Sequence, residues 1–451
     1  MKNKMIRVIS VLFVLLFIIN SSFISLYAIS YTNDVKTVSD SILLVNMDEE
    51  QVVFEKDADS RRYPASTTKI MTYIIAVENI PDLDNTRVPI KEEVLNTLLG
   101  TGSSLANLFN HIGETMTVID LLYSMMVPSG NDASIVLADY VGEGDISKFV
   151  DLMNKKAEEL GCKDTHFENP EGLHHENHYT TARDLYLITK YALTLPRFAE
   201  ICNTATYYCE GDEYPLITTN YLIDKARGGD YYYRYANGIK TGTTNEAGRC
   251  LVTTATADGY SYMAILLHAP YEEGVNDDDY GTMVDAADLF RWALTKLELG
   301  IVADTSTPVC EQKVKLSWGK DNVLLVPKEN LSAILPKGYE KKNIIIEYDT
   351  PESVDAPLEI DTVVGTATIY YKDDTMPQKQ LITTVDLVPN EKVELSGILY
   401  VLNVIATIMQ SYWFIVIIGL LIVILILYLI FTNIARKNSR KNRRVKNYRN
   451  L

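Results

Sequence analysis

Cysteine is scarce in this sequence, with five residues among 451. The count is odd and the spacings match no metal-binding pattern, so a disulfide-rich scaffold and a cysteine-based metal site are both excluded. Cys202 and Cys209 are close enough in sequence to form a local disulfide, and we expect most of the cysteines to be buried apolar residues. Internal repeats and low-complexity segments are absent as well, which argues against a repeat architecture.

Residues 8–432 carry no excess of positive charge. The formal net charge is −17, and basic residues gather without acidic ones in residues 1–7 and from Asn433 onward. Because nucleic-acid binding needs a basic surface, nucleic acid is excluded as a partner. A composition of 47% hydrophobic and 22% charged residues is typical of a folded protein, and the length indicates more than one domain.

The N-terminus carries an export signal. Residues 1–28 combine a basic start, an apolar run and smaller residues up to Ala28, which predicts a secretory signal peptide. The residue two before Ala28 is Leu26, which is larger than usual for a cleavage site. An uncleaved anchor is therefore the alternative.

A longer apolar run lies near the C-terminus. Trp413–Phe431 is 19 residues without a charge, and at about 1.5 Å per residue it can cross a bilayer core. It is too long and too uniformly apolar for the alternative, a buried core helix. We predict a transmembrane helix at 412–432 and, by the positive-inside rule, a cytoplasmic tail at 433–451. The body is then extracytoplasmic on a single-pass cell-membrane anchor, and residues 398–410 are predicted to lie along the membrane surface.

Strand and helix patterns divide the exported part into two domains. Residues 41–57 and 250–268 each predict a β-hairpin, with helical patterns between them. This order predicts an α+β domain over 35–300, with helices on a sheet built from both ends. Proline-punctuated strand patterns then predict a small all-β domain over 306–393. The clearest predicted helices are Val118–Met126, Ala133–Val141, Ile146–Leu160 and Ala182–Leu193.

A Ser-x-x-Lys pair lies at Ser66 and Lys69. Pro64 and Ser66 suit the first turn of a helix, which places Ser66 and Lys69 on the same side. A serine hydroxyl is a weak nucleophile unless a base lies beside it, and a lysine amine can be that base when its pKa is lowered. The same spacing occurs at Ser317–Lys320, where no helix is expected, so the spacing alone does not identify a catalytic serine.

Two further patterns each occur once. Ser129-Gly130-Asn131 offers a hydroxyl to relay a proton and an amide to hold a carbonyl, or else it is a loop that caps the next helix. The run from Lys240 to Thr243 offers a small glycine against which a peptide can lie, with lysine and threonine to bind a carboxylate. An ordinary polar edge strand is the alternative there.

In this order the three patterns are typical of penicillin-binding proteins and class A β-lactamases. The chain resembles low-molecular-mass penicillin-binding proteins of the D-alanyl-D-alanine carboxypeptidase type (serine peptidase family S11) over nearly all of 38–395. The resemblance implies the family's fold, an antiparallel sheet with helices, followed by the small all-β domain. The segments that carry it besides the three patterns are 64–72, 169–173, 178–185 and 237–243, with Ala356-Pro-Leu and Val364-Gly-Thr in the β domain.

The resemblance implies catalytic roles for Ser66, Lys69 and Ser129. Ser66 is the acylated nucleophile, Lys69 is its general base, and Ser129 relays protons to the leaving D-alanine. Asn131 positions the peptide.

The resemblance also implies a substrate-binding strand. Lys240 lowers the pKa of Lys69 and attracts the terminal carboxylate, with Thr241 or Thr243 assisting and Gly242 between them. The backbone N–H groups of Ser66 and Thr243 form the oxyanion hole. No metal and no cofactor is implied.

The implied activity is removal of the terminal D-alanine from peptidoglycan stem peptides that end in D-Ala-D-Ala. β-Lactams would acylate Ser66 and stall there. A D,D-endopeptidase of the same family is the first alternative. The second is a non-catalytic peptidoglycan-binding scaffold, which has no chemical need for the whole set of site residues.

The sequence departs from the family in one respect that concerns the substrate. Family members often carry an arginine just before the last helix of the catalytic domain, near the carboxylate site. Residues 276–282 contain none, so carboxylate binding is expected to be weaker or differently built.

Three other groups of residues have both a functional and a structural interpretation. Glu168 and Glu171 lie where class A β-lactamases place a deacylating glutamate, but the surrounding residues do not match, which disfavours a β-lactamase. Tyr231–Tyr235 lines a groove or packs at the surface, and packing is favoured. One cluster suggests a metal but lacks a second set of ligands, which favours a solvated loop. That cluster is His174, His175, Glu176 and His178.

Overall fold

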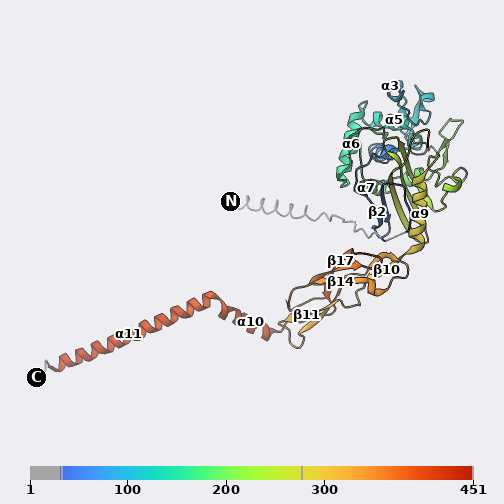
Figure 1. The fold of residues 1–451 in the computed structure, drawn as a ribbon. Coiled ribbons are helices and arrows are strands. Elements are labelled where there is room, and N and C mark those ends of the chain that lie inside the picture. The colour runs from blue at the N-terminus through green and yellow to red at the C-terminus, as the bar shows by residue number, and fades with distance from the viewer. Residues whose placement is uncertain (1–30, 32–33, 276–277, 449–451) are drawn as a thin grey trace. The chain divides into compact units, whose positions relative to one another are not determined.

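The computed structural model describes the backbone of residues 31, 34–275 and 278–448, with side chains up to residue 440 (Figure 1). The predicted signal peptide lies outside the described residues. The described chain forms two compact units, and each is described by itself. The first unit runs to Val302 and includes Ser332–Ile345 and Ile369–Thr383, and the second comprises Ala303–Leu331, Ile346–Thr368 and the residues from Thr384 onward.

The first unit is built on a five-stranded sheet in the order β2-β1-β9-β8-β7. Every neighbouring pair is antiparallel, and β1 pairs with β9 along its whole length. This pairing joins the two predicted hairpins into one sheet, as the sequence predicted, and leaves β7 at an edge. The strands are β1 (Ser41–Asn46), β2 (Gln51–Lys56), β7 (Ala236–Thr244), β8 (Gly248–Ala257) and β9 (Tyr260–Ala269).

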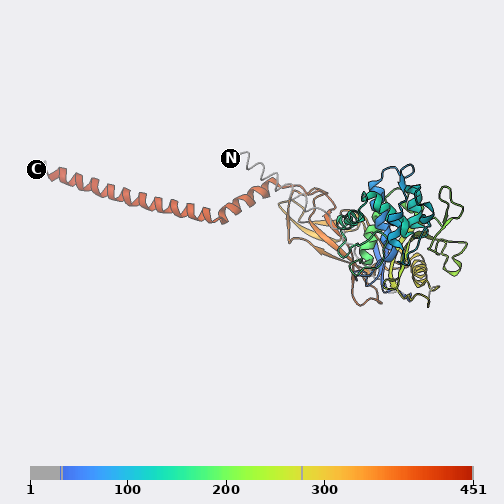
Figure 2. The same ribbon diagram turned by 90° about the horizontal axis from the view of Figure 1, so that it is seen from above.

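Helices cover both faces of this sheet, as Figures 1 and 2 show. Leu43 and Val45 point into the main core under the helical block, where α7 (Ala182–Ala192) packs on β1 and β9. Leu44, between them in sequence, is fully buried outside that core, as the alternation of a strand requires. Helix α9 (Gly281–Lys296) packs on β8 and β9. The sheet is therefore buried on both sides.

The helical block surrounds α2, which is buried from Lys69 to Ala76. The side chains of Thr117, Asp145 and Thr181 cap the helices that follow them by accepting backbone N–H bonds. The four predicted helices are confirmed within two residues at each end. The other helices besides α7 and α9 are α2 (Lys69–Asn79), α3 (Glu92–Leu95), α4 (Val118–Met126), α5 (Asn131–Val141), α6 (Ile146–Glu159) and α8 (Phe198–Cys202), with short pairs β3 (Arg87–Pro89)–β4 (Thr115–Thr117) and β5 (Thr206–Tyr207)–β6 (Leu216–Ile217).

The C-terminal β region is a six-stranded sheet in the order β14-β16-β17-β12-β11-β15, with β10 and β13 as a separate pair. The strand patterns in the sequence lie at 323–326, 344–348, 363–371 and 381–387, and β12, β14, β16 and β17 coincide with them. Ser317–Lys320 forms the turn between β11 and β12 and is not helical, as predicted. The strands are β10 (Leu297–Ala303), β11 (Cys310–Lys315), β12 (Asn322–Pro327), β13 (Leu331–Pro336), β14 (Ile344–Asp349), β15 (Val354–Asp355), β16 (Gly365–Tyr371) and β17 (Gln380–Pro389).

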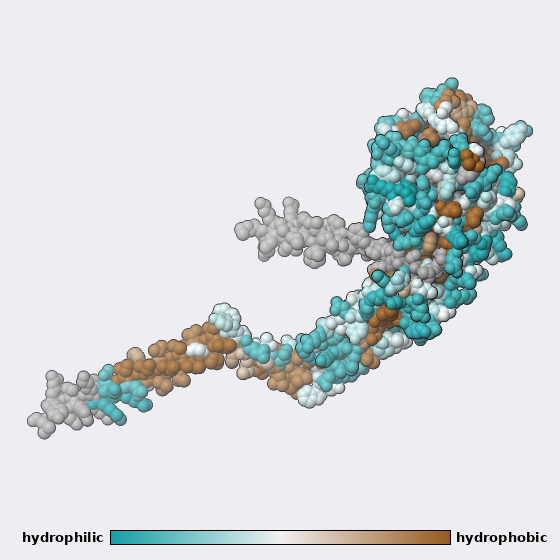
Figure 3. All heavy atoms as spheres, in the orientation of Figure 1, coloured by the Kyte–Doolittle hydropathy of each residue, from teal (hydrophilic) through white to brown (hydrophobic). Residues whose placement is uncertain are grey.

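Two exposed apolar helices end the chain. Helix α10 (Gly397–Gln410) has no buried residue, and Ser411 separates it from α11 (Tyr412–Tyr448). Within Tyr412–Arg440 of α11, the most apolar stretch of 18 residues has a mean hydropathy of 3.5, and none of it is buried. Figure 3 shows this apolar surface in brown. The helix has the length and composition of a membrane anchor.

All five cysteines are free thiols. The local disulfide considered for Cys202 and Cys209 is therefore not formed, and both side chains are instead buried in the core of the first unit. Cys250 is buried too, which agrees with the expected apolar role.

Candidate active site

Ser66 lies in the 3₁₀ turn Ala65–Thr68, which leads directly into α2. Lys69 is the first residue of α2 and is fully buried, and its Nζ lies 2.9 Å from Ser66 Oγ. The predicted spacing thus brings the hydroxyl and the amine into hydrogen-bond contact.

Three oxygens surround the Lys69 amine. Besides Ser66 Oγ, Nζ donates to Asn131 Oδ1 at 2.6 Å and to the Glu171 backbone oxygen at 2.7 Å. Burial, and then the charge of Lys240, hold the pKa of Lys69 well below its usual range. A neutral amine that donates to the two carbonyl-type oxygens keeps its lone pair for the Ser66 proton.

The loop between α4 and α5 brings Ser129 and Asn131 to the site. Ser129 has a left-handed backbone with φ of 65°, and its side chain is buried. A Cβ on Gly130 would lie 2.7 Å from the Ala106 Cβ, so only glycine fits there. Gly130 is the residue that caps α5, and no side chain caps it. The loop thus contains the N-cap of α5, as the structural alternative said, but the Ser129 side chain does not make a capping bond.

The edge strand β7 forms the opposite wall. Lys240 is buried, donates from Nζ to the Thr241 backbone oxygen at 3.0 Å, and has a pKa lowered by burial to about 7. A Cβ on Gly242 would lie 3.0 Å from the Ser66 backbone nitrogen. The absence of a side chain at Gly242 therefore lets β7 approach the Ser66 turn.

These segments enclose one cavity of about 250 Å³. Ser66 and Ser129 line it from one side, and Thr241, Gly242 and Thr243 line it from β7. The structure thus brings together all eight residues that the sequence selected. Five line the cavity, and Lys69, Asn131 and Lys240 are buried.

Similarity to known proteins follows the same division of the chain. Residues 29–271, more than half of the chain, match the family described as D-alanyl-D-alanine carboxypeptidase. The chain belongs to this family. It is therefore a peptidase. Residues 302–394 match a second family model, the C-terminal domain of penicillin-binding protein 5.

Individual relatives in this carboxypeptidase family match between 48% and 82% of the chain. The D-alanyl-D-alanine carboxypeptidase DacF of Bacillus subtilis is 27% identical over 360 residues, which are 79% of this chain and 87% of the relative. The enzyme of a Streptomyces species is 34% identical over 223 residues, 48% of this chain and 75% of the relative. The crystal structure of DacD from Francisella tularensis matches with a TM-score of 0.63 and 26% identity, over 82% of this chain and 97% of that chain.

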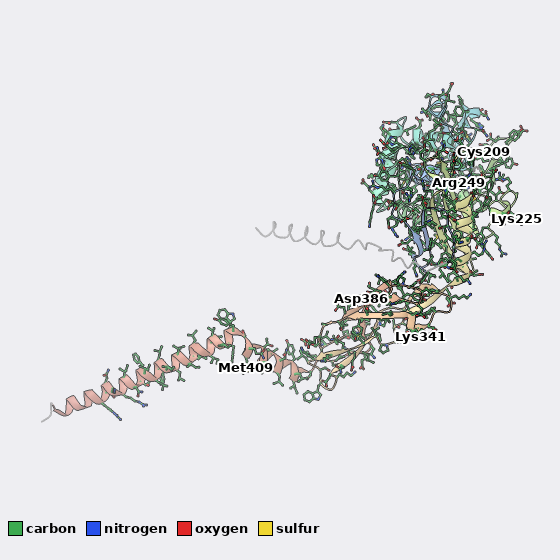
Figure 4. All side chains as sticks on the ribbon, viewed as in Figure 1. Cys209, Lys225, Arg249, Lys341, Asp386 and Met409 are labelled. Atoms are coloured by element: carbon green, nitrogen blue, oxygen red, sulfur yellow. The ribbon has the colours of Figure 1, made fainter. Side chains whose placement is uncertain are left out.

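Arg249, which the sequence analysis missed, lines the same cavity of this carboxypeptidase (labelled in Figure 4). It pairs with Thr243 across β7 and β8, so the two side chains share a face. Its guanidinium lies 4.2 Å from the ring centroid of Tyr280 and 4.7 Å from that of Tyr271. An arginine is thus present at the cavity, but from β8 rather than from residues 276–282. If β7 and β8 are taken as a hairpin with a short turn, Arg249 lies opposite Thr243, and this pairing would have identified the arginine from the sequence.

Tyr231 supports the cavity wall by packing. Its ring centroid lies 5.4 Å from that of Tyr280 and 6.4 Å from that of Tyr221, and both of those residues line the cavity. Packing was the favoured interpretation of the tyrosine run.

The histidine cluster is partly structural. His178 is buried, its Nε2 lies 2.8 Å from Thr68 Oγ1, and burial lowers its pKa to about 3. The solvated-loop prediction is thus wrong for His178, because the side chain supports the turn before Lys69. Among residues 31–448 that the structure describes, no group of three His, Cys, Asp or Glu side chains could hold a metal ion.

Proposed function

We propose that this peptidase is a serine-type D-Ala-D-Ala carboxypeptidase that trims peptidoglycan stem peptides through an acyl-enzyme on Ser66. The observation that carries the proposal is the 2.9 Å contact between Ser66 Oγ and the buried Lys69 amine, whose pKa is depressed. A nucleophile in contact with a base whose pKa is lowered is what acyl transfer requires. The named relatives, which are D-alanyl-D-alanine carboxypeptidases, support the substrate.

Each step of the proposed cycle uses a described side chain. Lys69 takes the Ser66 proton as Oγ attacks the carbonyl carbon of the penultimate D-alanine. The N–H groups of Ser66 and Thr243 hold the oxyanion, which is worth roughly 3–4 kcal/mol for each donor. Ser129 passes a proton to the leaving amine of D-alanine, and Asn131 holds the peptide. Water then hydrolyses the ester, whereas a β-lactam leaves a slowly hydrolysed one.

The proposal includes the cellular arrangement. Residues 1–28 direct export, the catalytic domain over 35–300 and the β domain over 306–393 lie outside the membrane, and α11 anchors the chain. The apolar surface of α11 and the basic residues that follow its apolar stretch support this orientation. The enzyme then meets peptidoglycan at the outer face of the cell membrane.

The test uses the full chain in detergent. Its intact mass after incubation with penicillin should rise by one penicillin, and it should release D-alanine from a pentapeptide that ends in D-Ala-D-Ala. Cleavage of a cross-linked peptide dimer in preference to the pentapeptide would favour the endopeptidase alternative. A folded protein that gives neither adduct nor D-alanine would refute the proposal.

Arg249 should matter for substrates that end in a carboxylate. A charge-assisted bond of this kind is worth about 1.5–3 kcal/mol, so Arg249→Leu should lower kcat/KM roughly 10- to 100-fold for the peptide acid. The same peptide ending in a carboxamide should be turned over equally by both proteins, and Arg249→Lys should recover part of the loss. An equal loss on acid and amide would mean that Arg249 only packs against its tyrosines.

A further inference from the structure

The loop that contains Glu171 is fastened to the start of α2. Asn169 Oδ1 accepts the N–H groups of Gly172 and Leu173 at 2.7 and 3.1 Å, which closes the loop on itself. Thr72 Oγ1 donates to the Pro170 oxygen at 2.5 Å, and Lys69 Nζ donates to the Glu171 oxygen. One turn of α2 thus holds the loop at two points.

The Glu171 carboxyl group is buried inside this arrangement. The residue is 7% exposed, and its Oε2 atom is buried without a hydrogen-bond partner. It does not line the substrate cavity. A buried carboxyl group with an unsatisfied oxygen is costly, and such groups persist in proteins where a neighbouring charge or a function compensates.

The compensating group is Lys69. Burial raises the pKa of Glu171, and the nearby Lys69 ammonium opposes that rise. Conversely, a Glu171 carboxylate favours the Lys69 ammonium, as does Asp132, while burial and Lys240 disfavour it. Asp132 is already satisfied by the N–H groups of Ala106 and Leu108. Glu171 differs from Asp132 in that its Oε2 atom has no hydrogen-bond partner.

We propose that Glu171 is a positioning residue for Lys69, whose backbone carbonyl aims the amine at Ser66 and whose carboxylate is the counter-charge for the ammonium. This inference rests on the proposed function of Lys69 as the base. A negative charge on the carboxyl group keeps the Lys69 proton bound to higher pH than burial and Lys240 alone would allow. The pH at which the enzyme gains activity is thus set jointly by the two side chains.

The test is the pH profile of Glu171→Gln. Without the negative charge Lys69 becomes neutral at lower pH. The acid limb of the pH profile, which is the pH range over which the acylation rate rises, should therefore move to lower pH by about 1 unit. The rate is measured between pH 5 and 10 on the full chain, as the increase in the penicillin adduct with time. Glu168→Gln is the matched control, because Glu168 is partly exposed and lies against His166 and His175. Its acid limb should stay at the wild-type pH.

The outcomes separate this inference from the proposed function. If the wild-type chain forms no adduct, the proposed function fails. If the wild-type chain is acylated and Glu171→Gln keeps its acid limb, only the role of Glu171 fails. Should Glu171→Gln not fold, Glu171→Ala and Glu171→Asp replace it. The aspartate variant keeps the negative charge, so the acid limb of its pH profile should lie closer to that of the wild type than the acid limb of the alanine variant does. If the acid limbs of the two variants coincide, the role of Glu171 as counter-charge is refuted.

Discussion

Ser66→Ala should abolish the penicillin adduct and lower kcat/KM for D-alanine release by roughly 10⁴-fold or more. The substitution removes one oxygen from a half-buried side chain at the cavity, so the fold should survive. Lys69 would keep its bonds to Asn131 and the Glu171 oxygen. The loss would then be chemical, because no other hydroxyl touches the Lys69 amine among the described residues.

The matched control for Ser66→Ala is Ser129→Ala. Both serines line the cavity, but Ser129 makes no contact with Lys69 that would activate it as a nucleophile. This variant should still form the adduct, with a rate lowered roughly 10²-fold through loss of proton relay. Retention of the adduct in Ser66→Ala together with its loss in Ser129→Ala would assign the nucleophile to Ser129 instead. Intact mass spectrometry distinguishes the two results directly.

Gly172→Ala should also have a large effect, because it destabilises the fold next to the Ser66 turn. Gly172 has φ of +90°, and a Cβ there would lie 2.0 Å from the Ala65 oxygen and 3.0 Å from the Ser66 nitrogen. Left-handed strain and overpacking together cost roughly 2–5 kcal/mol. For a unit of this size the melting temperature should fall by roughly 10 °C. The protein that remains folded should be acylated more slowly, because the Ser66 turn must shift.

Gly161→Ala separates strain from collision. Gly161 also has a positive φ, +82°, but a Cβ there meets nothing within 4 Å. It should cost only the backbone strain, roughly 1–2 kcal/mol, and leave acylation unchanged. The two variants are compared by thermal unfolding of the full chain in detergent and by the rate of penicillin labelling. Equal effects at both glycines would show that contact with the Ser66 turn does not matter.

The sequence contained most of the fold and of the site because the informative patterns are local. Ser66 and Lys69 are three residues apart at the start of a helix, and this spacing alone predicts that their side chains lie on the same side. Helix α4, from Val118 to Met126, is a mostly apolar segment with a capping threonine before it. The order of the two hairpins around the helical block predicted one shared sheet, whereas the pairing of β1 with β9 came from the structure.

The missed features depend on tertiary contacts. Arg249 reaches the cavity only through the register of β7 and β8, and Glu171 is buried only because its loop folds onto α2. Strands β11 and β13 were not predicted, because β11 alternates with charged residues and β13 is a short apolar run between turns. Short patterns of this kind do not distinguish a strand from a loop.

The central place of β9 in the five-stranded sheet has a consequence for biogenesis. Ser41 pairs with Leu267, so the sheet lacks its middle until nearly the whole first unit has been synthesised. Pairings so distant along the chain form slowly, since the loop between them must close first. A chain that crosses the membrane from its N-terminus, as proposed, would therefore stay extended while it is threaded through a narrow channel. Under that proposal, the late synthesis of β9 would delay formation of the sheet until most of the first unit has been exported.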